Sequence, residues 1–341
     1  MKSINYNIAA ITGGHNVPSA RYRVTNLAPF LDDLGINLDE IAPKHSRYPP
    51  RGIWNRFTWL PQVMVERASF CRRVRGYDAV ILQRELISTL PSFERLVPGV
   101  KIFDVDDAIY LRKRGLAAKY ASRSCDMVVC GNEYLAERFK QWNKRIEIIP
   151  TGVNIRDMRL DLNRLNSGKK IVGWIGTPGN LKFLKSISSP LAKALSKHSA
   201  ELRICTSGIH DVPSELRKFT KFVKWYPGIE FEELPRWAVG LMPLIDDEWS
   251  RGKCSFKLLQ YLSAGIPGIA SPVGMNQIVL ADGRAGKLAR TEDEWFSALN
   301  DLLGDAEMNL DMGMHGRRTV EQRYSLEVIA QSWNQVIRNL I

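Results

Sequence analysis

The sequence predicts an α/β protein made of two doubly wound, Rossmann-like domains with a cleft between them. Three observations support this fold class. The chain has 341 residues, which is long for a single hydrophobic core. Short apolar segments alternate along it with helical patterns, as in parallel sheets covered by helices. The alternation stops at a polar segment rich in Asn, Ser and Gly, 160–170, and then starts again.

The first half of the chain opens with a predicted strand at 4–11, a turn at Gly13 and Gly14, and a helix at 20–34. Short, unbroken apolar segments, typical of interior parallel strands, come next. The remaining segments of strand or helix type lie at 78–83, 101–105, 127–130, 132–142 and 146–149. Together these elements predict a Rossmann-like N-terminal domain over 1–160, with a crevice at the carboxyl end of its first strand.

The second half repeats this order of elements. Its segments of strand type lie at 171–175, 202–206 and 268–270. The stretch 253–276, KCSFKLLQYLSAGIPGIASPVGMN, predicts a helix that stops at Gly265 and is followed by the last of these strands. Lys253 and Lys257 lie at the start of that helix, where N–H groups and positive charge suit a phosphate; an ordinary crossover with solvated lysines fits equally well. These elements predict a second Rossmann-like domain over 161–322.

Composition indicates a globular protein in a reducing compartment. Hydrophobic residues make up 45% of the chain and charged residues 25%. No apolar run approaches the ~18 to 20 residues that a membrane-spanning helix requires, and the N-terminus lacks the pattern of a signal peptide. The five cysteines are scattered and form no pair at metal-binding spacing. We therefore expect free thiols, a cytoplasmic location and no metal site.

The net charge of +12 suits an anionic partner, such as nucleic acid, anionic lipid or a phosphorylated substrate. No nucleic-acid-binding motif or basic recognition helix is present, which disfavours nucleic acid. The cations concentrate in segment 44–75, where Glu66 is the single acid and aromatic residues are interleaved. This mixture predicts either that the protein binds peripherally to an anionic membrane surface, at the inner face of the cell membrane, or that the segment is a solvated basic loop with a few core aromatics.

Several sequence motifs follow one another along the chain. They read SARYRV, DVDDAIY at 104–110, CDMVVCGNEYL, IIPTGVN, GWIGTPGN, GLMPLIDD and the 253–276 stretch. In this order and spacing they resemble the family 4 glycosyltransferases, two-domain enzymes of the GT-B fold, over nearly the whole chain. The resemblance implies that the first domain holds the acceptor, the second holds the nucleotide, and a last helix, 323–341, crosses back to the first. It also implies transfer with retention of configuration, without a metal or a cofactor.

The resemblance implies a donor site made of lysines, backbone N–H groups and one amide. Its predicted residues are Gly13, Gly14, Gly176, Thr177, Lys253, Lys257 and Gln260. Without a metal, the lysines and N–H groups would stabilise the departing diphosphate. Many family members carry two glutamates at the positions that Gly252 and Gln260 occupy here. Gln260 still offers a carbonyl oxygen to a ribose hydroxyl, so we interpret the change as a subfamily with its own donor grip or as a silent enzyme.

The cluster Asp104-Val-Asp106-Asp107 follows a predicted strand. Paired carboxylates there suit Mg²⁺ on a diphosphate. The resemblance instead makes Asp106 and Asp107 the candidate catalytic residues, which bind acceptor hydroxyls or orient the nucleophile. A plainer alternative is that Asp107 caps the next helix. Arg21 and Arg23 open a predicted helix, where cations oppose the dipole; they predict either contact with an acceptor phosphate or a solvated helix start.

The predicted function is a retaining glycosyltransferase that moves a sugar from a nucleotide-diphosphate donor to a glycan or to a lipid-linked cell-envelope acceptor. The nucleotide-sugar is a substrate, so no cofactor is expected. Three alternatives stay open at this point. They are a catalytically silent partner subunit, prompted by Gly252 and Gln260, a nucleotide-sugar epimerase on the same fold, and a basic nucleic-acid-binding protein.

Overall fold

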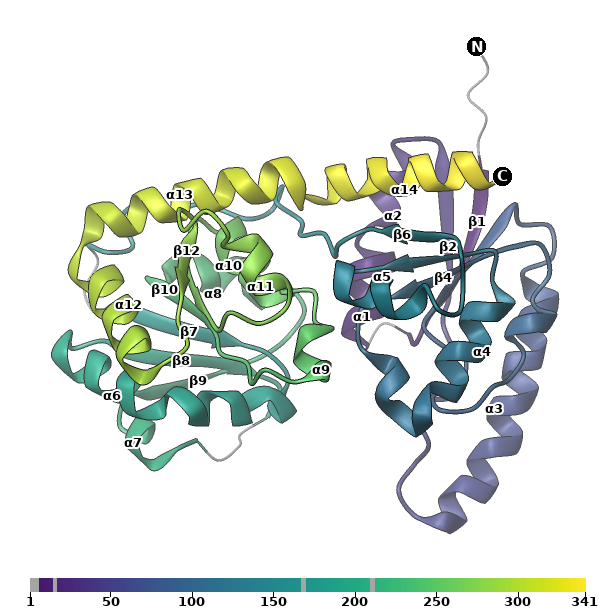
Figure 1. Ribbon diagram of the computed structural model, residues 1–341, viewed down its shortest axis with the longest axis horizontal. Helices are drawn as coiled ribbons and strands as arrows, with labels where there is room; N and C mark the ends of the chain where they lie inside the picture. The colour runs from purple at the N-terminus through teal and green to yellow at the C-terminus, as the bar shows by residue number, and fades with distance from the viewer. Residues whose placement is uncertain (1–5, 15–16, 167–169, 209–211) are drawn as a thin grey trace. The chain divides into compact units, whose positions relative to one another are not determined.

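The computed structural model describes residues 6–14, 17–166, 170–208 and 212–341 (Figure 1). Contacts between residues divide the chain into two units. Unit 1 comprises Met1–Gly152, Gly252–Cys254 and Leu326–Ile341, and unit 2 comprises Val153–Arg251 and Ser255–Ser325. The start of the predicted strand 4–11 and part of the predicted linker, 167–169, lie outside the described residues.

Unit 1 contains a parallel sheet in the order β2-β1-β3-β4-β5-β6. Its strands are β1 (Tyr6–Ile11), β2 (Ile36–Ile41), β3 (Ala79–Gln83), β4 (Val100–Val105), β5 (Met127–Cys130) and β6 (Ile146–Ile148). The order reverses between β1 and β3, which makes this a topological switch point, the place where doubly wound folds bind ligands. Strand β2 is absent from the sequence prediction, because its more exposed positions hold Asn, Asp and Glu, which are poor strand formers.

Helices cover this sheet. They are α1 (Pro18–Ala20), the π-helix η1 (Arg21–Thr25), α2 (Ala28–Asp32), α3 (Ile53–Arg73), the 3₁₀ segments η2 (Glu94–Leu96) and η3 (Ile109–Gly115), α4 (Leu116–Ser124), α5 (Glu133–Phe139) and α14 (Leu326–Leu340). The predicted helix at 20–34 is therefore interrupted. It changes to π geometry after Ala20, and α2 restarts where Pro29, which has no N–H group, occupies its first turn.

Helix α14 completes the hydrophobic core of unit 1. Its buried residues recur every three or four positions, as expected of a helix with one apolar face. Ile329, Trp333 and Ile337 share a core cluster with Ile8 of β1 and Phe30 of α2. The closing helix predicted at 323–341 thus begins at Leu326 and packs on the sheet that carries the candidate acceptor residues.

Segment 44–75 is largely helical, so its interpretation as a loop is wrong for α3. The helix continues through Pro61, whose ring faces solvent. Val63, Arg67 and Phe70 are its buried residues. In the part of the chain that the structure describes, no helix is long and apolar enough to cross a membrane.

Unit 2 contains a second parallel sheet, in the order β12-β11-β10-β7-β8-β9. Its strands are β7 (Ile171–Ile175), β8 (Glu201–Thr206), β9 (Thr220–Lys224), β10 (Val239–Met242), β11 (Gly268–Ala270) and β12 (Gly286–Leu288). Its helical segments are η4 (Pro178–Ile187), α6 (Ser188–Lys197), α7 (Ser214–Arg217), α8 (Ile229–Glu233), η5 (Leu234–Arg236), α9 (Glu248–Arg251), α10 (Phe256–Ser263), α11 (Met275–Val279), α12 (Glu292–Gly304) and α13 (Ala306–Arg323). Its switch point lies between β7 and β10.

Candidate functional site

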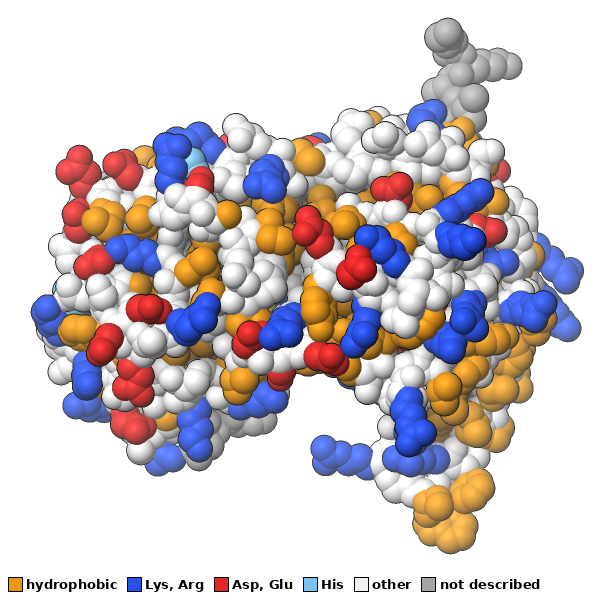
Figure 2. All heavy atoms as spheres, viewed as in Figure 1, with side chains coloured by type: hydrophobic (Ala, Val, Ile, Leu, Met, Phe, Trp, Pro, Cys, Tyr) orange, Lys and Arg blue, Asp and Glu red, His pale blue; other side chains and the backbone are white. Residues whose placement is uncertain are grey.

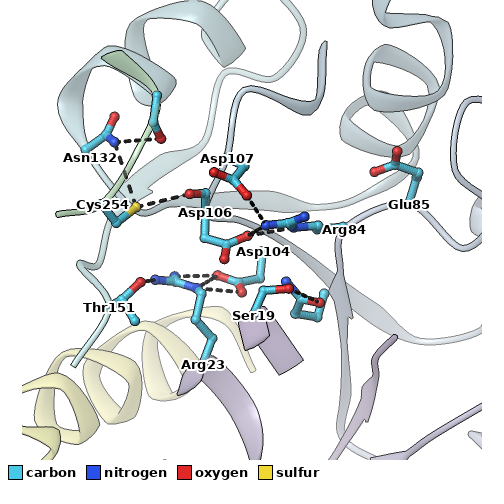
Figure 3. A network of polar contacts seen from close by, with 12 residues as sticks. Ser19, Arg23, Arg84, Glu85, Asp104, Asp106, Asp107, Asn132, Thr151 and Cys254 are labelled. Atoms are coloured by element: carbon cyan, nitrogen blue, oxygen red, sulfur yellow. Dashed lines mark hydrogen bonds and ion pairs between the residues drawn. The ribbon is translucent and has the colours of Figure 1, made fainter. Parts of the chain in front are cut away.

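The first aspartate of the predicted cluster is held by an arginine inside unit 1 (Figure 3). Arg23 Nε lies 2.8 Å from Asp104 Oδ2, and Arg23 Nη2 lies 2.5 Å from Oδ1. The same guanidinium donates to Thr151 Oγ1 and to the Ile149 carbonyl, each at 3.1 Å. Both charged side chains are 1% exposed. Arg23 is therefore buried and fully engaged inside unit 1, so it has a structural role and is not placed to contact an acceptor phosphate as predicted.

Arg84 brings together the other two aspartates. Its Nε lies 2.7 Å from Asp106 Oδ1, and its Nη2 lies 2.5 Å from Asp107 Oδ2. Arg84 follows β3 directly, and its amide bonds the Asp104 carbonyl at the end of β4. Its φ of 64° is unusual for a residue other than glycine, and such conformations concentrate at functional sites. This arginine is the main site residue that the sequence reasoning missed.

The two paired carboxylates differ in their affinity for a proton. Burial opposes ionisation of Asp106, but the Arg84 guanidinium outweighs it and lowers the pKa of Asp106 below its usual value. Burial and the neighbouring charge of Asp106 raise the pKa of Asp107 despite the same arginine. Asp107 is also the more exposed of the two side chains, at 23% against 13%. The arrangement suits a fixed anion beside a group that exchanges a proton.

This geometry bears on two alternatives for the aspartates. Because one oxygen of each carboxylate is engaged by Arg84, the pair does not offer Mg²⁺ the open oxygen ligands that it prefers. Across the described residues, no group of three or more His, Cys, Asp or Glu side chains is arranged to hold a metal ion. Asp107 does not cap the next helix, whose N-cap is Ala108 without a side-chain hydrogen bond.

The segment Gly252–Cys254, which contacts place in unit 1, lies against this cluster (Figure 3). Cys254 Sγ donates to the Asp106 carbonyl at 3.2 Å, and Asn132 Nδ2 donates to the Gly252 carbonyl at 3.1 Å. Burial raises the pKa of Cys254 to about 12, so its thiol stays neutral. A Cβ at Gly252 would lie 2.8 Å from the Ala108 Cβ, so no glutamate fits here without a shift of the backbone.

The glycine turn after β1 has a steric reason of its own. Gly14 has a φ of 90°, and its amide bonds Thr12 Oγ1 at 3.0 Å. A Cβ at Gly13 would lie 2.9 Å from Arg47 Nη2, so the turn accommodates a buried arginine. Arg47 in turn donates to the Gln83 carbonyl at 2.8 Å, which ties the turn to the end of β3. The role of Gly13 and Gly14 in donor binding stays a prediction.

In unit 2, Lys257 lies at the carboxyl end of β7. A Cβ at Gly176 would lie 2.5 Å from Lys257 Cε, so any larger residue here would displace the end of this lysine side chain. Lys257 Nζ lies 4.6 Å from the centre of the Trp174 ring, within the range of a cation–π contact. The predicted donor residues Gly176 and Lys257 are thus neighbours, with Thr177 next in the chain.

Helix α10 is anchored at the switch point of unit 2. The Tyr261 hydroxyl accepts from the Ile175 amide of β7 at 3.3 Å and donates to the Leu241 carbonyl of β10 at 3.1 Å. The helix begins at Phe256, after Ser255 with a φ of 51°. Lys257 therefore occupies its first turn, whereas Lys253 precedes it and belongs by contacts to unit 1. The prediction that both lysines lie on one helix is wrong for Lys253.

The predicted donor residue Gln260 lies within this helix. Gln260 is 4% exposed, so little of its surface is accessible to a ribose hydroxyl. In the acidic loop before α9, Asp246 pairs with Arg251 at 2.6 Å, and Asp247 Oδ1 accepts the Ser250 amide at 2.7 Å. These two carboxylates therefore stabilise α9.

Replacing Arg84 with glutamine is expected to move the acidic limb of the pH–activity profile upward by about one to three pH units. The reason is that Arg84 holds the pKa of Asp106 below its usual value, and a neutral side chain does not. The measurement is kcat/KM of each protein between acidic and neutral pH. An unchanged limb would show that ionisation of Asp106 does not control activity; Arg123→Gln on the exposed side of α4 is the matched control.

No protein-family model and no curated protein matches this sequence. Solved structures share its fold. Sucrose-phosphate synthase from Thermosynechococcus elongatus aligns with a TM-score of 0.75 at 16% identity, covering 98% of this chain and 99% of that one. HepE from Anabaena, solved with UDP and glucose, aligns with a TM-score of 0.73 at 11% identity over 98% and 100% of the two chains. WaaG, a glycosyltransferase involved in lipopolysaccharide biosynthesis, gives 0.64 at 12% identity over 97% and 99%. The predicted GT-B fold is confirmed.

Proposed function

We propose that this protein is a glycosyltransferase, which moves a sugar from a nucleotide-diphosphate donor to a glycan or lipid-linked acceptor of the cell envelope. The observation that carries this assignment is the placement of Lys257 against Gly176 at the carboxyl end of β7. Doubly wound sheets bind nucleotides at such a switch point. HepE, which shares the fold, has been solved with UDP and with UDP-glucose, which supports a nucleotide-sugar as the ligand.

Unit 2 would hold the donor. The ammonium of Lys257 and the backbone N–H groups of Gly176 and Thr177 would stabilise negative charge on the departing diphosphate, in place of a metal ion. The Lys257 ammonium already lies over the Trp174 ring, so less side-chain entropy is lost when a phosphate binds than for a lysine without such a contact. Gln260 would accept a hydrogen bond from the ribose. The role of Lys253 in donor binding stays a prediction, because this residue belongs by contacts to unit 1.

Unit 1 would hold the acceptor. Asp106, kept ionised by Arg84, would accept hydrogen bonds from acceptor hydroxyls. Asp107, whose pKa is raised, would take or return the proton of the attacking hydroxyl. Arg21 would contact an anionic group of the acceptor. We take transfer to retain the configuration of the sugar, as the family resemblance implies, and to occur at the cytoplasmic face of the membrane.

Thermal unfolding in the presence of UDP, GDP and ADP, and of their common sugar conjugates, tests the donor assignment. A nucleotide at about 100 times its Kd stabilises the unit that binds it by about 2.7 kcal/mol. We expect one diphosphate to raise the Tm selectively, to the same extent in Mg²⁺ and in EDTA. Stabilisation that EDTA abolishes would contradict metal independence, and no stabilisation by any nucleotide would contradict the transferase assignment.

A second candidate, a catalytically silent partner subunit, is favoured by one observation. Gly252, at a position where many family members carry a glutamate, packs against Ala108. Such a protein would bind a nucleotide without consuming its sugar conjugate. Donor turnover with a cell-envelope extract as the source of acceptor separates the two functions. Turnover of the donor to an isomeric nucleotide-sugar without the extract would indicate an epimerase instead.

A further inference from the structure

Helix α3 exposes a broad apolar face to solvent. Trp54 is 81% exposed, Phe57 is 66% exposed and Val65 is 72% exposed. The exposed apolar residues of the helix are Ile53, Trp54, Phe57, Leu60, Pro61, Met64, Val65 and Ala68. Scattered single hydrophobic residues need no explanation on a protein surface, but a contiguous group of this kind marks an interaction site.

The spacing of these residues places them in one stripe. At 100° per residue, all of them fall within about 140° of the helix circumference. The buried residues Val63, Arg67 and Phe70 fall within about 60° of the circumference beside this stripe, where they pack on unit 1. The helix therefore has two faces. One packs against unit 1, and the other is apolar and is not covered by the part of the chain that the structure describes.

The first turns of α3 extend past the unit that carries them. Every residue from 53 to 58 is exposed. Figure 1 shows this end of the helix projecting beyond the sheet of its unit, and Figure 2 shows hydrophobic side chains gathered there with cations beside them. The 21-residue helix is about 30 Å long, so a flat surface laid on its apolar face contacts both ends at once.

Cations surround the apolar stripe. They are Arg51 and Arg56 at the projecting end and Arg72, Arg73 and Arg75 at the other end, and all are exposed. Glu66, the single acid of segment 44–75, is already engaged, since it accepts from Arg67 Nη1 at 2.6 Å and from the Lys44 amide at 2.6 Å. The face is thus apolar along its centre and positive at its two ends.

We infer that this face of α3 lies in the interface of an anionic membrane, with Trp54 and Phe57 at headgroup depth and the arginines on lipid phosphates. Tryptophan and phenylalanine on an amphipathic helix prefer that depth, and arginines beside them bind anionic headgroups. A second copy of the chain would instead bring its positive ends close to these positive ends. The charge pattern therefore favours a negative partner with an apolar interior.

Membrane binding is separate from the proposed transfer reaction. Lys257, Gly176 and Gln260 belong to unit 2, whereas α3 belongs to unit 1. Nucleotide-induced stabilisation and vesicle binding are measured on the same full-length protein, so either property can fail while the other holds.

The test is cosedimentation of the full-length protein with vesicles of phosphatidylcholine alone, or of phosphatidylcholine and phosphatidylglycerol in equal parts. We expect binding to the anionic vesicles, weakened by high salt. The double variant Trp54→Ser with Phe57→Ser is expected to lower the partition coefficient at least tenfold, on the order expected from the loss of two interfacial aromatic contacts. Arg51→Gln and Arg56→Gln are expected to lower it about fivefold each.

Unit 2 supplies matched controls. Phe222→Ser removes an exposed phenylalanine, and Lys221→Gln with Lys224→Gln removes two exposed cations; neither variant should change binding. All variants alter exposed side chains, so their thermal unfolding should match the parent. Binding that the α3 variants leave unchanged, or absence of binding to anionic vesicles, would overturn the inference. A dimer that only the α3 variants dissociate would overturn it too, and would assign the face to a second copy.

Discussion

Replacing Arg23 with methionine is expected to lower the free energy of unfolding by about 3–5 kcal/mol, because the change leaves a buried carboxylate without its partner. Arg23 and Asp104 are each 1% exposed and share three hydrogen bonds of 3.0 Å or less. Both side chains are buried, so solvent compensates little for the loss of the guanidinium. Urea denaturation at neutral pH, followed by circular dichroism, measures the loss.

The pH dependence identifies the mechanism of this loss. Burial raises the pKa of Asp104, and the positive charge of Arg23 opposes that rise. In the Arg23→Met protein the opposition is gone, so folded Asp104 binds a proton more readily than unfolded Asp104 does. Stability of the variant should then increase as the pH falls from neutral toward the ordinary pKa of about 4. A deficit that is independent of pH would assign the loss to packing.

Asp104→Asn in the same protein is the companion change. A neutral amide removes the buried charge, and the double variant should regain roughly half or more of the lost stability at neutral pH. If the double variant is no more stable than Arg23→Met alone, the ion pair does not explain the effect.

The sheets could be predicted from the sequence where their strands are interior. The strands β3, β5, β7 and β11 are short, mostly apolar runs that are buried except at Met127, the first residue of β5, and runs of this kind can be recognised in a sequence. The edge strand β9 escaped because its sequence, TKFVK, is largely exposed and alternates with lysine. Helix α3 escaped for a related reason: its apolar residues face solvent, and it contains Pro61, a residue that usually interrupts helices.

The candidate site divides in the same way. Asp106 and Asp107 could be found because carboxylates that directly follow a strand form a local pattern. Arg84 could not, because its partners come from the neighbouring strand, and the pairing of Gln83 with Asp104 that aligns them is set by the sheet register. The buried pairing of Arg23 depends likewise on contacts with residues more than eighty positions away in the chain.

The second large effect is expected at Lys257. Lys257→Ala should lower kcat/KM for sugar transfer by about 10²–10³-fold, the usual loss when one group that stabilises developing negative charge is removed. Gly176 leaves room for this side chain, and the Trp174 ring aligns it, so the alanine protein has no other group in that position. Steady-state kinetics with the nucleotide-sugar found by thermal unfolding measures the loss.

The division of that loss between kcat and KM shows what the lysine does. If Lys257 stabilises the diphosphate as it departs, kcat falls strongly and donor affinity changes little. If it only binds the phosphates, KM rises and kcat stays the same. Lys257→Arg should keep part of the activity, since it keeps the charge. Lys182→Ala, which removes an exposed lysine of η4 beside Phe183, should leave both constants unchanged. An alanine variant with full activity would place the diphosphate elsewhere in unit 2.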